Sequence, residues 1–349
     1  MPIPAKFRDL PLPPPSRGYD WGPFMPFILL HLLVFGALWT GTTWVDWTVC
    51  AVLYAVRMFA VTGVYHRYFS HRTYKTSRWF QFVLAFLAQT SSQKGALWWG
   101  AHHRTHHKFS DLPWDVHSPI QKGFWYSHVL WLVDRGTEHT DYSKIKDLAK
   151  YPELVWLNKH WLVPPVSLGV ATWWLFGWSG LFIGFCLSTV LCWHITFFVN
   201  SLAHVTGKRR FETSDTSRNS WWIALITFGE GWHNNHHHYM GSTRQGFYWW
   251  EIDVTYYVLR ALAAVGLIWD LRPVPPAILA EGRARDAAAR RDRNNAQLCR
   301  PPPSHVQHPV DPSQRSRQPA LGRDARRRCP LHDRRQRALA RRRAPRARA

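Results

Sequence analysis

The chain alternates between long apolar stretches and polar, charged segments, and the lengths of the apolar stretches predict its architecture. Four of them, at about 24–41, 47–65, 161–178 and 181–203, approach the ~20 residues that a helix needs to cross a bilayer. A fifth, at about 79–88, is too short to span and is predicted to be an interfacial helix. Short connectors join the first stretch to the second and the third to the fourth. The pattern therefore predicts an all-α integral membrane protein with four transmembrane helices in two hairpins.

Positive charge is distributed unequally between the two ends of the predicted helices. Neither short connector contains Lys or Arg, whereas the opposite side carries Lys6, Arg8, the region 67–159 and everything after Lys208. Cytoplasmic loops hold the excess of Lys and Arg in membrane proteins, so we expect both termini to be cytoplasmic. Residues 1–23 are then a cytosolic segment, and a bacterial inner membrane is the expected location.

Composition changes abruptly at about residue 281. Residues 281–349 contain 20 Arg and 6 acidic residues but no Lys and no aromatic residue, and they supply +14 of the formal net charge of +22. Such a segment cannot bury enough apolar surface to offset its ordering entropy, so this Arg-rich tail is predicted to be disordered. We interpret it as a passive extension; the alternatives are binding to nucleic acid or anionic lipid, and an out-of-frame translation of GC-rich DNA. Nucleic acid is not an expected partner, and residues 24–280 hold the folded domain.

Histidine occurs 20 times, and its spacing indicates a metal site. H-R-Y-F-S-H begins at His66, H-R-T-H-H at His103 and H-N-N-H-H at His233, while N-S-L-A-H ends at His204. Positions i, i+3 and i+4 share one face of a helix, so the three histidines of each later box project together. His66 and His71 are five positions apart, about 140° around an α-helix, and can meet only where the helix ends or bends. All these groups lie on the side assigned to the cytoplasm.

The number of imidazoles indicates how many metal ions they hold. Imidazole suits iron, copper, zinc and nickel but not magnesium or calcium. Nine donors exceed the about four that a single zinc takes, which predicts two metal ions with open coordination positions. The predicted ligands are His66, His71, His103, His106, His107, His204, His233, His236 and His237. The alternatives are adventitious binding by a His-rich tract and a polytopic metal transporter, although transporters usually place their ligands at mid-bilayer.

Other polar residues near the boxes have weaker assignments. Glu230, Asp111 and Asp115 are candidates to accept hydrogen bonds from ligand imidazoles, with helix capping as the alternative. His31, His128 and His160 are interpreted as structural. Arg57 and His194 fall within predicted spans, so either these helices extend past the bilayer or the two side chains face the protein interior. The predicted lining of an apolar tunnel is Trp98, Trp99 and Trp222.

Together these motifs resemble those of the membrane acyl-CoA desaturases of the delta-9, stearoyl-CoA type. Besides the three boxes, segments 123–132 and 200–204 match, and the likeness covers about residues 25–272 in order. It implies a cytosolic helical cap that holds a histidine-ligated di-iron centre. The family's metal ligands fall on the nine histidines above, and its water-mediated metal contact falls on Asn200. His102 stands where the family often has an acidic residue, so contacts to a substrate headgroup are expected to differ there.

The resemblance also implies a reaction and its partners. The expected function is O2-dependent insertion of a cis double bond, at the delta-9 position, into a saturated acyl-CoA. An acyl-lipid desaturase and a membrane fatty acid hydroxylase with the same site are the alternatives. Two iron ions are the implied cofactor. Because no haem-binding module is fused to the chain, we expect a separate electron donor, a ferredoxin or small cytochrome with its reductase. An acidic donor would suit the basic cytoplasmic face.

Overall fold

The computed structural model describes residues 3–13, 16 and 18–298, and its secondary structure is almost entirely helical. The described residues up to Leu279 form one compact unit, and those from Ala280 to Leu298 belong to a second. The described part of the second unit is the remainder of helix α15 (Pro276–Leu298). Residues 281–298, which were assigned to the disordered tail, are therefore helical, in keeping with the high helix propensity of their many Ala and Arg residues. Residues 299–349 of the predicted tail lie outside the described residues.

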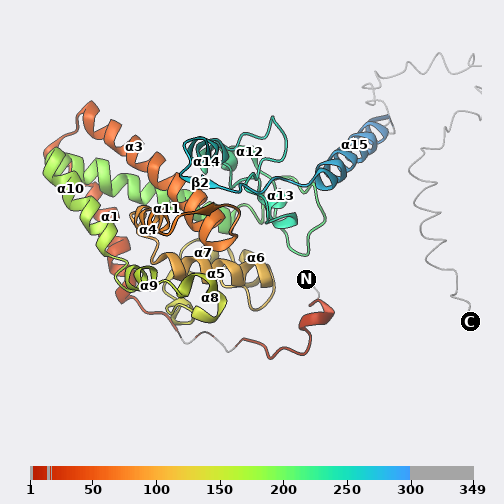
Figure 1. Ribbon diagram of the computed structural model, residues 1–349, viewed down its shortest axis with the longest axis horizontal. Coiled ribbons are helices and arrows are strands. Elements are labelled where there is room, and N and C mark those ends of the chain that lie inside the picture. The colour runs from red at the N-terminus through yellow and green to blue at the C-terminus, as the bar shows by residue number, and fades with distance from the viewer. Residues whose placement is uncertain (1–2, 14–15, 17, 299–349) are drawn as a thin grey trace, which may run out of the picture. The chain divides into compact units, whose positions relative to one another are not determined.

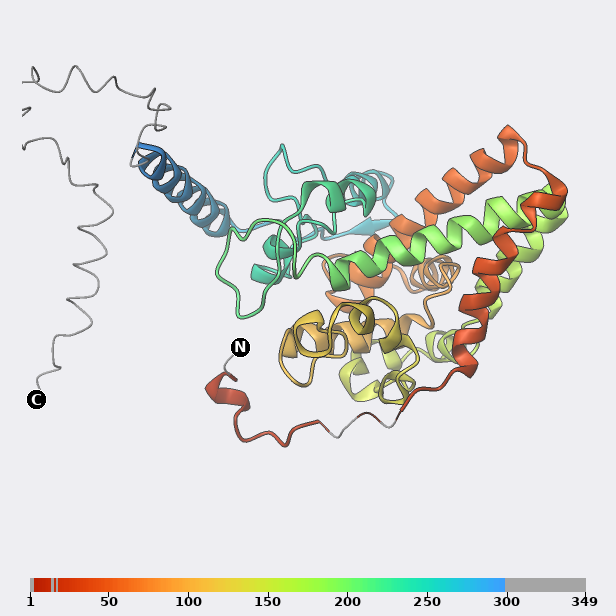
Figure 2. The same ribbon diagram turned by 180° about the vertical axis from the view of Figure 1, so that it is seen from behind.

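The apolar stretches form the long helices of the first unit. These are α1 (Met25–Val34) with α2 (Ala37–Thr40), α3 (Trp44–Phe59) with the π-helical segment η3 (Ala60–Ser70), and α10 (Val163–Ser179) with the π-helical segment η7 (Gly180–Leu187) and α11 (Ser188–Ser201). Figures 1 and 2 show α1, α3, α10 and α11 lying beside one another. Two continuous runs, Trp44–Ser70 and Val163–Ser201, are long and apolar enough to cross a membrane, while Met25–Thr40 is shorter.

The run from α10 to α11 is not one straight helix, because the backbone reverses at Gly177. This residue has φ 68° and ψ −163°, a conformation that is essentially restricted to glycine. Beyond the turn, the ring of Phe185 lies against Gly169, so the two halves are packed side by side. The chain thus forms a hairpin here, with its turn slightly before the connector predicted around Ser179.

The other hairpin turn precedes α3, which begins with a capping box. The Thr43 side chain accepts a hydrogen bond from the backbone N–H of Asp46, and the Asp46 carboxylate accepts one from the N–H of Thr43 at 2.7 Å. The same carboxylate accepts a hydrogen bond from the Ser179 hydroxyl at 3.1 Å. Asp46 therefore joins the two hairpin turns to each other.

The polar segments fold into shorter elements around the ends of the long helices (Figure 1). The helices are α4 (Arg78–Gln89), α5 (Ala96–Phe109), α6 (Pro119–Lys122), α7 (Phe124–His128), α8 (Lys146–Ala149), α9 (Pro152–Lys159), α12 (Trp221–Ile226), α13 (His233–His238) and α14 (Val254–Ala264). The 3₁₀ segments are η1 (Ala5–Phe7), η2 (Gly22–Phe24), η4 (Leu130–Leu132), η5 (Arg135–Thr137) and η6 (Tyr142–Lys144). Strands β1 (Lys75–Thr76) and β2 (Ile268–Trp269) pair antiparallel, with Lys75 opposite Trp269. Helix α4 covers the stretch 79–88, where a short helix was predicted.

Polar residues of the long helices face the protein interior. Arg57 is fully buried, and its guanidinium donates hydrogen bonds to the Thr189 hydroxyl at 2.5 Å and to the carbonyl of Leu53 at 3.1 Å. His194 lies between His31 and His128, with ring nitrogens 2.9 and 3.0 Å apart respectively. These contacts satisfy polar groups that would otherwise be costly in an apolar surrounding.

Candidate metal centre

The first histidine pair is brought together by an unusual helix geometry. Residues 60–70 are π-helical and buried throughout, and the N–H of His71 bonds the carbonyl of His66 at 3.2 Å. An i→i+5 hydrogen-bond pattern stacks residues that are five positions apart, as an α-helix does not. The two imidazole rings consequently lie 4.9 Å apart between centroids. The π-helical geometry therefore brings together two histidines that an α-helix would hold about 140° apart.

The nine predicted ligands come together in two groups. Within each group the imidazole nitrogens lie within 4.8 Å of one another. The first group is His66, His71, His103, His107 and His236, and the second is His106, His204, His233 and His237. Each box on α5 and α13 is therefore divided: His106 belongs to a different group from its neighbours on α5, and His236 from its neighbours on α13.

The donor sets fit transition-metal ions. In the first group, Nε2 of His236 lies 2.9 Å from Nε2 of His66 and 3.0 Å from Nε2 of His107. In the second, Nε2 of His204 lies 3.1 Å from Nε2 of His233. Nε2 of His237 is buried and has no hydrogen-bond partner in the described part of the chain. Converging neutral nitrogens of this kind suit iron, copper, zinc or nickel.

Carboxylates lie behind several of these rings and hold their outer nitrogens. Asp115 Oδ1 is 2.9 Å from Nδ1 of His106, and Asp111 Oδ2 is 3.1 Å from Nδ1 of His204. Glu230 contacts Nδ1 of His66 and also pairs with the guanidinium of Arg67. A carboxylate that accepts the Nδ1 proton leaves the Nε2 lone pair free to face a metal. All three acidic residues singled out in the sequence thus lie against ligand imidazoles.

The sequence did not single out three further residues at the centre. Asp215 Oδ2 lies 2.7 Å from Nδ1 of His237, and the side-chain amide of Gln245 lies 3.2 Å from Nδ1 of His66. His117 stacks on His106 with ring centroids 4.4 Å apart, outside both groups. Asp215 and Gln245 belong to loops without histidine, so no histidine spacing in the sequence indicated them. His117 is two residues after Asp115, and this proximity could have indicated that it lies near the centre.

The pKa values of several groups at the centre are shifted in the directions that favour anionic carboxylates and neutral imidazoles, whereas Asp115 raises the pKa of His106. Burial alone would raise the pKa of the Asp215 carboxyl, but His237 and a hydrogen bond from Ser217 hold it well below its usual range. Burial, reinforced by the neighbouring imidazoles, holds the pKa values of His103 and His107 well below the ordinary histidine value. Neutral imidazoles backed by anionic carboxylates are the form in which histidine binds metal.

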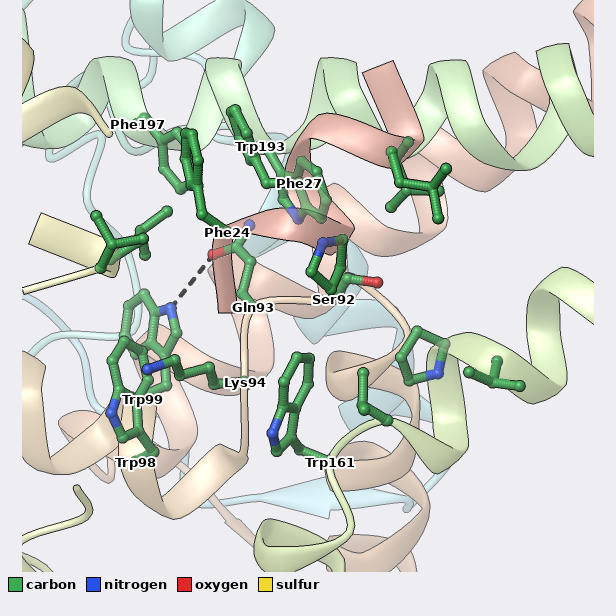
Figure 3. A pocket seen from close by; sticks show the side chains of 18 of the residues that line it. Phe24, Phe27, Ser92, Gln93, Lys94, Trp98, Trp99, Trp161, Trp193 and Phe197 are labelled. Carbon is green, nitrogen blue, oxygen red and sulfur yellow. Dashed lines mark hydrogen bonds between the residues drawn. The ribbon is translucent and has the colours of Figure 1, made fainter. Parts of the chain in front are cut away.

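Trp99 lines three cavities, two of which are bordered by candidate ligand histidines. A cavity of about 40 Å³ is bordered by ligand histidines and by Asn200 of α11. A cavity of about 260 Å³ lies further away, between α1, α10 and the loop before α5 (Figure 3). Trp98 also lines this larger cavity, whereas Trp222 lines none of the three. Trp222 stands at the start of α12 with 38% of its surface exposed, so its predicted place in a tunnel stays a prediction.

The indole of Trp99 is fixed between the larger cavity and the metal ligands. It stacks on His103 with ring centroids 4.8 Å apart and donates a hydrogen bond to Gln93 at 3.4 Å (Figure 3). The Gln93 amide in turn donates to the Thr196 hydroxyl at 3.2 Å. His102, which follows the tryptophan pair, turns away from both ligand groups and bonds the carbonyl of Trp98 at 2.9 Å.

Comparison with known proteins agrees with this site. Residues 42–270 match the model of the fatty acid desaturase family. The chain is 37% identical over 275 residues to an sn-2 palmitoyl-lipid 9-desaturase of Nostoc sp. (strain 36), which covers 75% of this chain and 95% of that protein. It is 35% identical to a chloroplastic palmitoyl-monogalactosyldiacylglycerol delta-7 desaturase of Arabidopsis thaliana, covering 73% of this chain and 70% of that one. It is also 37% identical to an acyl-CoA C20 Delta5-desaturase of Anemone leveillei, in a match that covers 70% of this chain and 78% of that protein.

Proposed function

This chain belongs to the fatty acid desaturase family of oxidoreductases, and on that premise we propose that it inserts a cis double bond into a saturated fatty acyl chain, at the delta-9 position. The observation that carries the proposal is the pair of histidine groups beside an apolar cavity. Two iron ions bound there supply the O2-dependent oxidation of adjacent methylene groups, which no amino-acid side chain can perform.

The protein's own residues hold the metal ions and orient the substrate. The proposed iron ligands are the nine histidines of the two groups, with Asn200 contacting one ion through a water molecule. Asp111, Asp115 and Glu230 fix the imidazole tautomers by accepting Nδ1 protons. Trp98 and Trp99 guide the acyl chain and keep water away from the ions.

We propose a membrane topology of four spans in two hairpins, within a desaturase domain of residues 24–280. Large apolar side chains exposed on the outer faces of the long helices support it, since contiguous exposed apolar surface marks contact with lipid or a partner. Trp39, Trp44 and Trp174 are 86%, 78% and 78% exposed. The positive-inside rule then puts the metal centre and both termini in the cytoplasm, with a bacterial inner membrane as the location.

The substrate carrier and the electron donor complete the proposal. The sequence motifs favour acyl-CoA, while the Nostoc and Arabidopsis relatives are named as lipid desaturases, which favours an acyl-lipid as the second candidate. A fatty acid hydroxylase with the same centre is the remaining alternative. Electrons come from a separate ferredoxin or small cytochrome with its reductase, attracted by the basic cytoplasmic face.

The function is tested by expressing the full chain in a desaturase-deficient host and analysing its fatty acids. We expect monounsaturated chains and about two iron ions per purified chain. His106→Ala and His236→Ala each remove a ligand from a different group and should abolish the product while the protein remains membrane-inserted. His160→Ala is the matched control, because His160 is exposed and contacts Trp156 away from both groups. Hydroxylated chains without any monoene, or zinc as the native metal, would overturn the proposal.

A further inference from the structure

The larger cavity is built mainly from the helices that we propose to span the membrane. Phe24 and Phe27 line it from the α1 side (Figure 3). Leu30 of α1 and Pro165 and Val166 of α10 also line it. Several of these helix residues also face outward, since Leu29 is 54% and Val166 56% exposed while both border the cavity. The cavity therefore adjoins the surface that would contact lipid hydrocarbon.

A single charged side chain, that of Lys94, lines this apolar cavity. Its ammonium lies 4.6 Å from the centroid of the Trp98 ring, and Figure 3 shows the side chain extending toward Trp98 and Trp99. Within the described part of the chain, no carboxylate lies within ion-pair distance of this ammonium and no acceptor hydrogen-bonds it. Asp20 and Glu138 favour its charged form only at longer range, and burial lowers its pKa. A cation in this setting lacks an anionic partner.

The backbone around Lys94 is held in place. Ser92 and Lys94 have φ of 58° and 61°, in the left-handed region that side chains other than glycine seldom adopt. The Tyr65 hydroxyl donates a hydrogen bond to the Lys94 carbonyl at 2.7 Å. Such conformations persist where surrounding contacts enforce them, and they gather at ligand-binding positions. The ammonium is thereby presented to the cavity from a defined position.

The Lys94 ammonium also lies close to the residues that separate the cavity from the metal centre. It is 4.6 Å from the ring centroid of Trp98, and the neighbouring Trp99 indole stacks on His103 with ring centroids 4.8 Å apart. A lipid held at Lys94 is therefore placed beside the tryptophan that borders both the cavity and the candidate ligands.

On the premise of the proposed desaturase function, we propose that this cavity admits an acyl chain of a membrane glycerophospholipid sideways from the bilayer, and that the Lys94 ammonium binds the phosphate of that lipid. The apolar walls bury the hydrocarbon, and the phosphate is the anion that Lys94 lacks. Trp99, which borders both this cavity and the metal centre, guides the chain onward.

Binding is tested first without relying on turnover. Purified full-length protein is incubated with dipalmitoyl phosphatidylglycerol or with the uncharged dipalmitoyl monogalactosyldiacylglycerol, and retained lipid is measured by native mass spectrometry. Lys94→Met should retain roughly tenfold less phosphatidylglycerol than wild type and equal galactolipid, because a hydrogen bond to a charged group is lost. Lys94→Arg should restore retention. Lys75→Met is the matched control, because Lys75 is 64% exposed and pairs with Asp270 elsewhere. Equal losses for both lipids would assign Lys94 a merely structural role and overturn the proposal.

Turnover in reconstituted vesicles then tests the route. Val166→Trp should close the lipid side of the cavity and lower kcat/KM for phospholipid-linked palmitoyl chains at least tenfold, while Val170→Trp should not. Val170 is 56% exposed on the same helix but does not line the cavity. Lys94→Met should raise KM for the phospholipid with kcat retained. Turnover of palmitoyl-CoA or free palmitate alone by the wild type would overturn lipid access while leaving the desaturase function intact; no unsaturated product from any substrate would instead refute the proposed function.

Discussion

The carboxylate of Asp215 lies 2.7 Å from Nδ1 of His237, although the two residues are 22 positions apart in the chain. It also accepts hydrogen bonds from the backbone N–H and the hydroxyl of Ser217, which keep it ionised and oriented. We predict that Asp215→Ala lowers the iron affinity of the protein by about 10- to 100-fold, as loss of a carboxylate behind a ligand histidine generally does. The iron affinity is measured by competition with a chelator, with the iron that remains bound to the protein as the readout.

Asp141→Ala is the control for this prediction. Asp141 is 54% exposed and bonds only nearby groups such as Ser143, so its loss should leave the iron affinity unchanged. An Asp215→Ala protein that competes for iron as well as wild type would show that the Asp215–His237 contact has no part in metal binding.

Acid should release the metal and destabilise the fold together. Burial lowers the pKa of His102 to about 4 and holds those of the ligands His103, His107 and His236 well below the ordinary value. In the unfolded chain these groups take up protons below about pH 6.5. At these groups the folded protein binds fewer protons than the unfolded chain, so their contribution to the free energy of unfolding is greatest above that pH and falls as the pH drops toward 4. Ligand imidazoles must also be neutral to bind metal. Iron content and Tm, measured from pH 8 to pH 5, should decline together below about pH 6.5, and constancy of both would contradict this.

The contact between His31 and His194 should stabilise α1 against α11. Replacing His194 by Leu leaves a ring nitrogen of His31 and one of His128 without their partner, at a cost of about 1–3 kcal/mol for each buried unsatisfied group. The double variant His31→Leu/His194→Leu should cost less than the sum of the single variants, with a coupling of about 0.5–3 kcal/mol. Unfolding in detergent, followed by tryptophan fluorescence, measures the free energies of unfolding of the wild type, the two single variants and the double variant. Pairing His31→Leu with His160→Leu should give additive effects, and additivity for His31 with His194 would refute the coupling.

The turn at Gly177 should tolerate no side chain without strain. A Cβ added there meets no atom within 4 Å, so the cost arises from the backbone conformation alone. We expect Gly177→Ala to lower the free energy of unfolding by about 1–2 kcal/mol, seen as a lower Tm in detergent. Leu175→Ala, at a 61% exposed position of the same helix, should change Tm much less. An unchanged Tm for Gly177→Ala would indicate that the turn can relax.

Much of the molecule followed from local patterns. The apolar stretches correctly predicted where the long helices lie, and the i, i+3, i+4 spacing placed each later histidine box on one helix face. The turn predicted around Ser179 lies slightly earlier, at Gly177, because its position depends on one backbone torsion angle. The helix over residues 281–298 was missed, because it depends on helix propensity within a charged segment. The assignment of Trp222 to the tunnel stays a prediction, since Trp222 lines none of the three cavities that Trp99 borders.

The sequence by itself determined the number and spacing of the candidate ligand imidazoles, the apolar lengths and the family, because these are properties of residues close together in the chain. The tertiary structure alone decided that His106 and His107 lie in different groups, that Asp215 contacts His237, and that Lys94 lines the larger cavity together with Trp99. Those relationships depend on the packing of segments that are distant in sequence, and short-range periodicity carries no information about such packing.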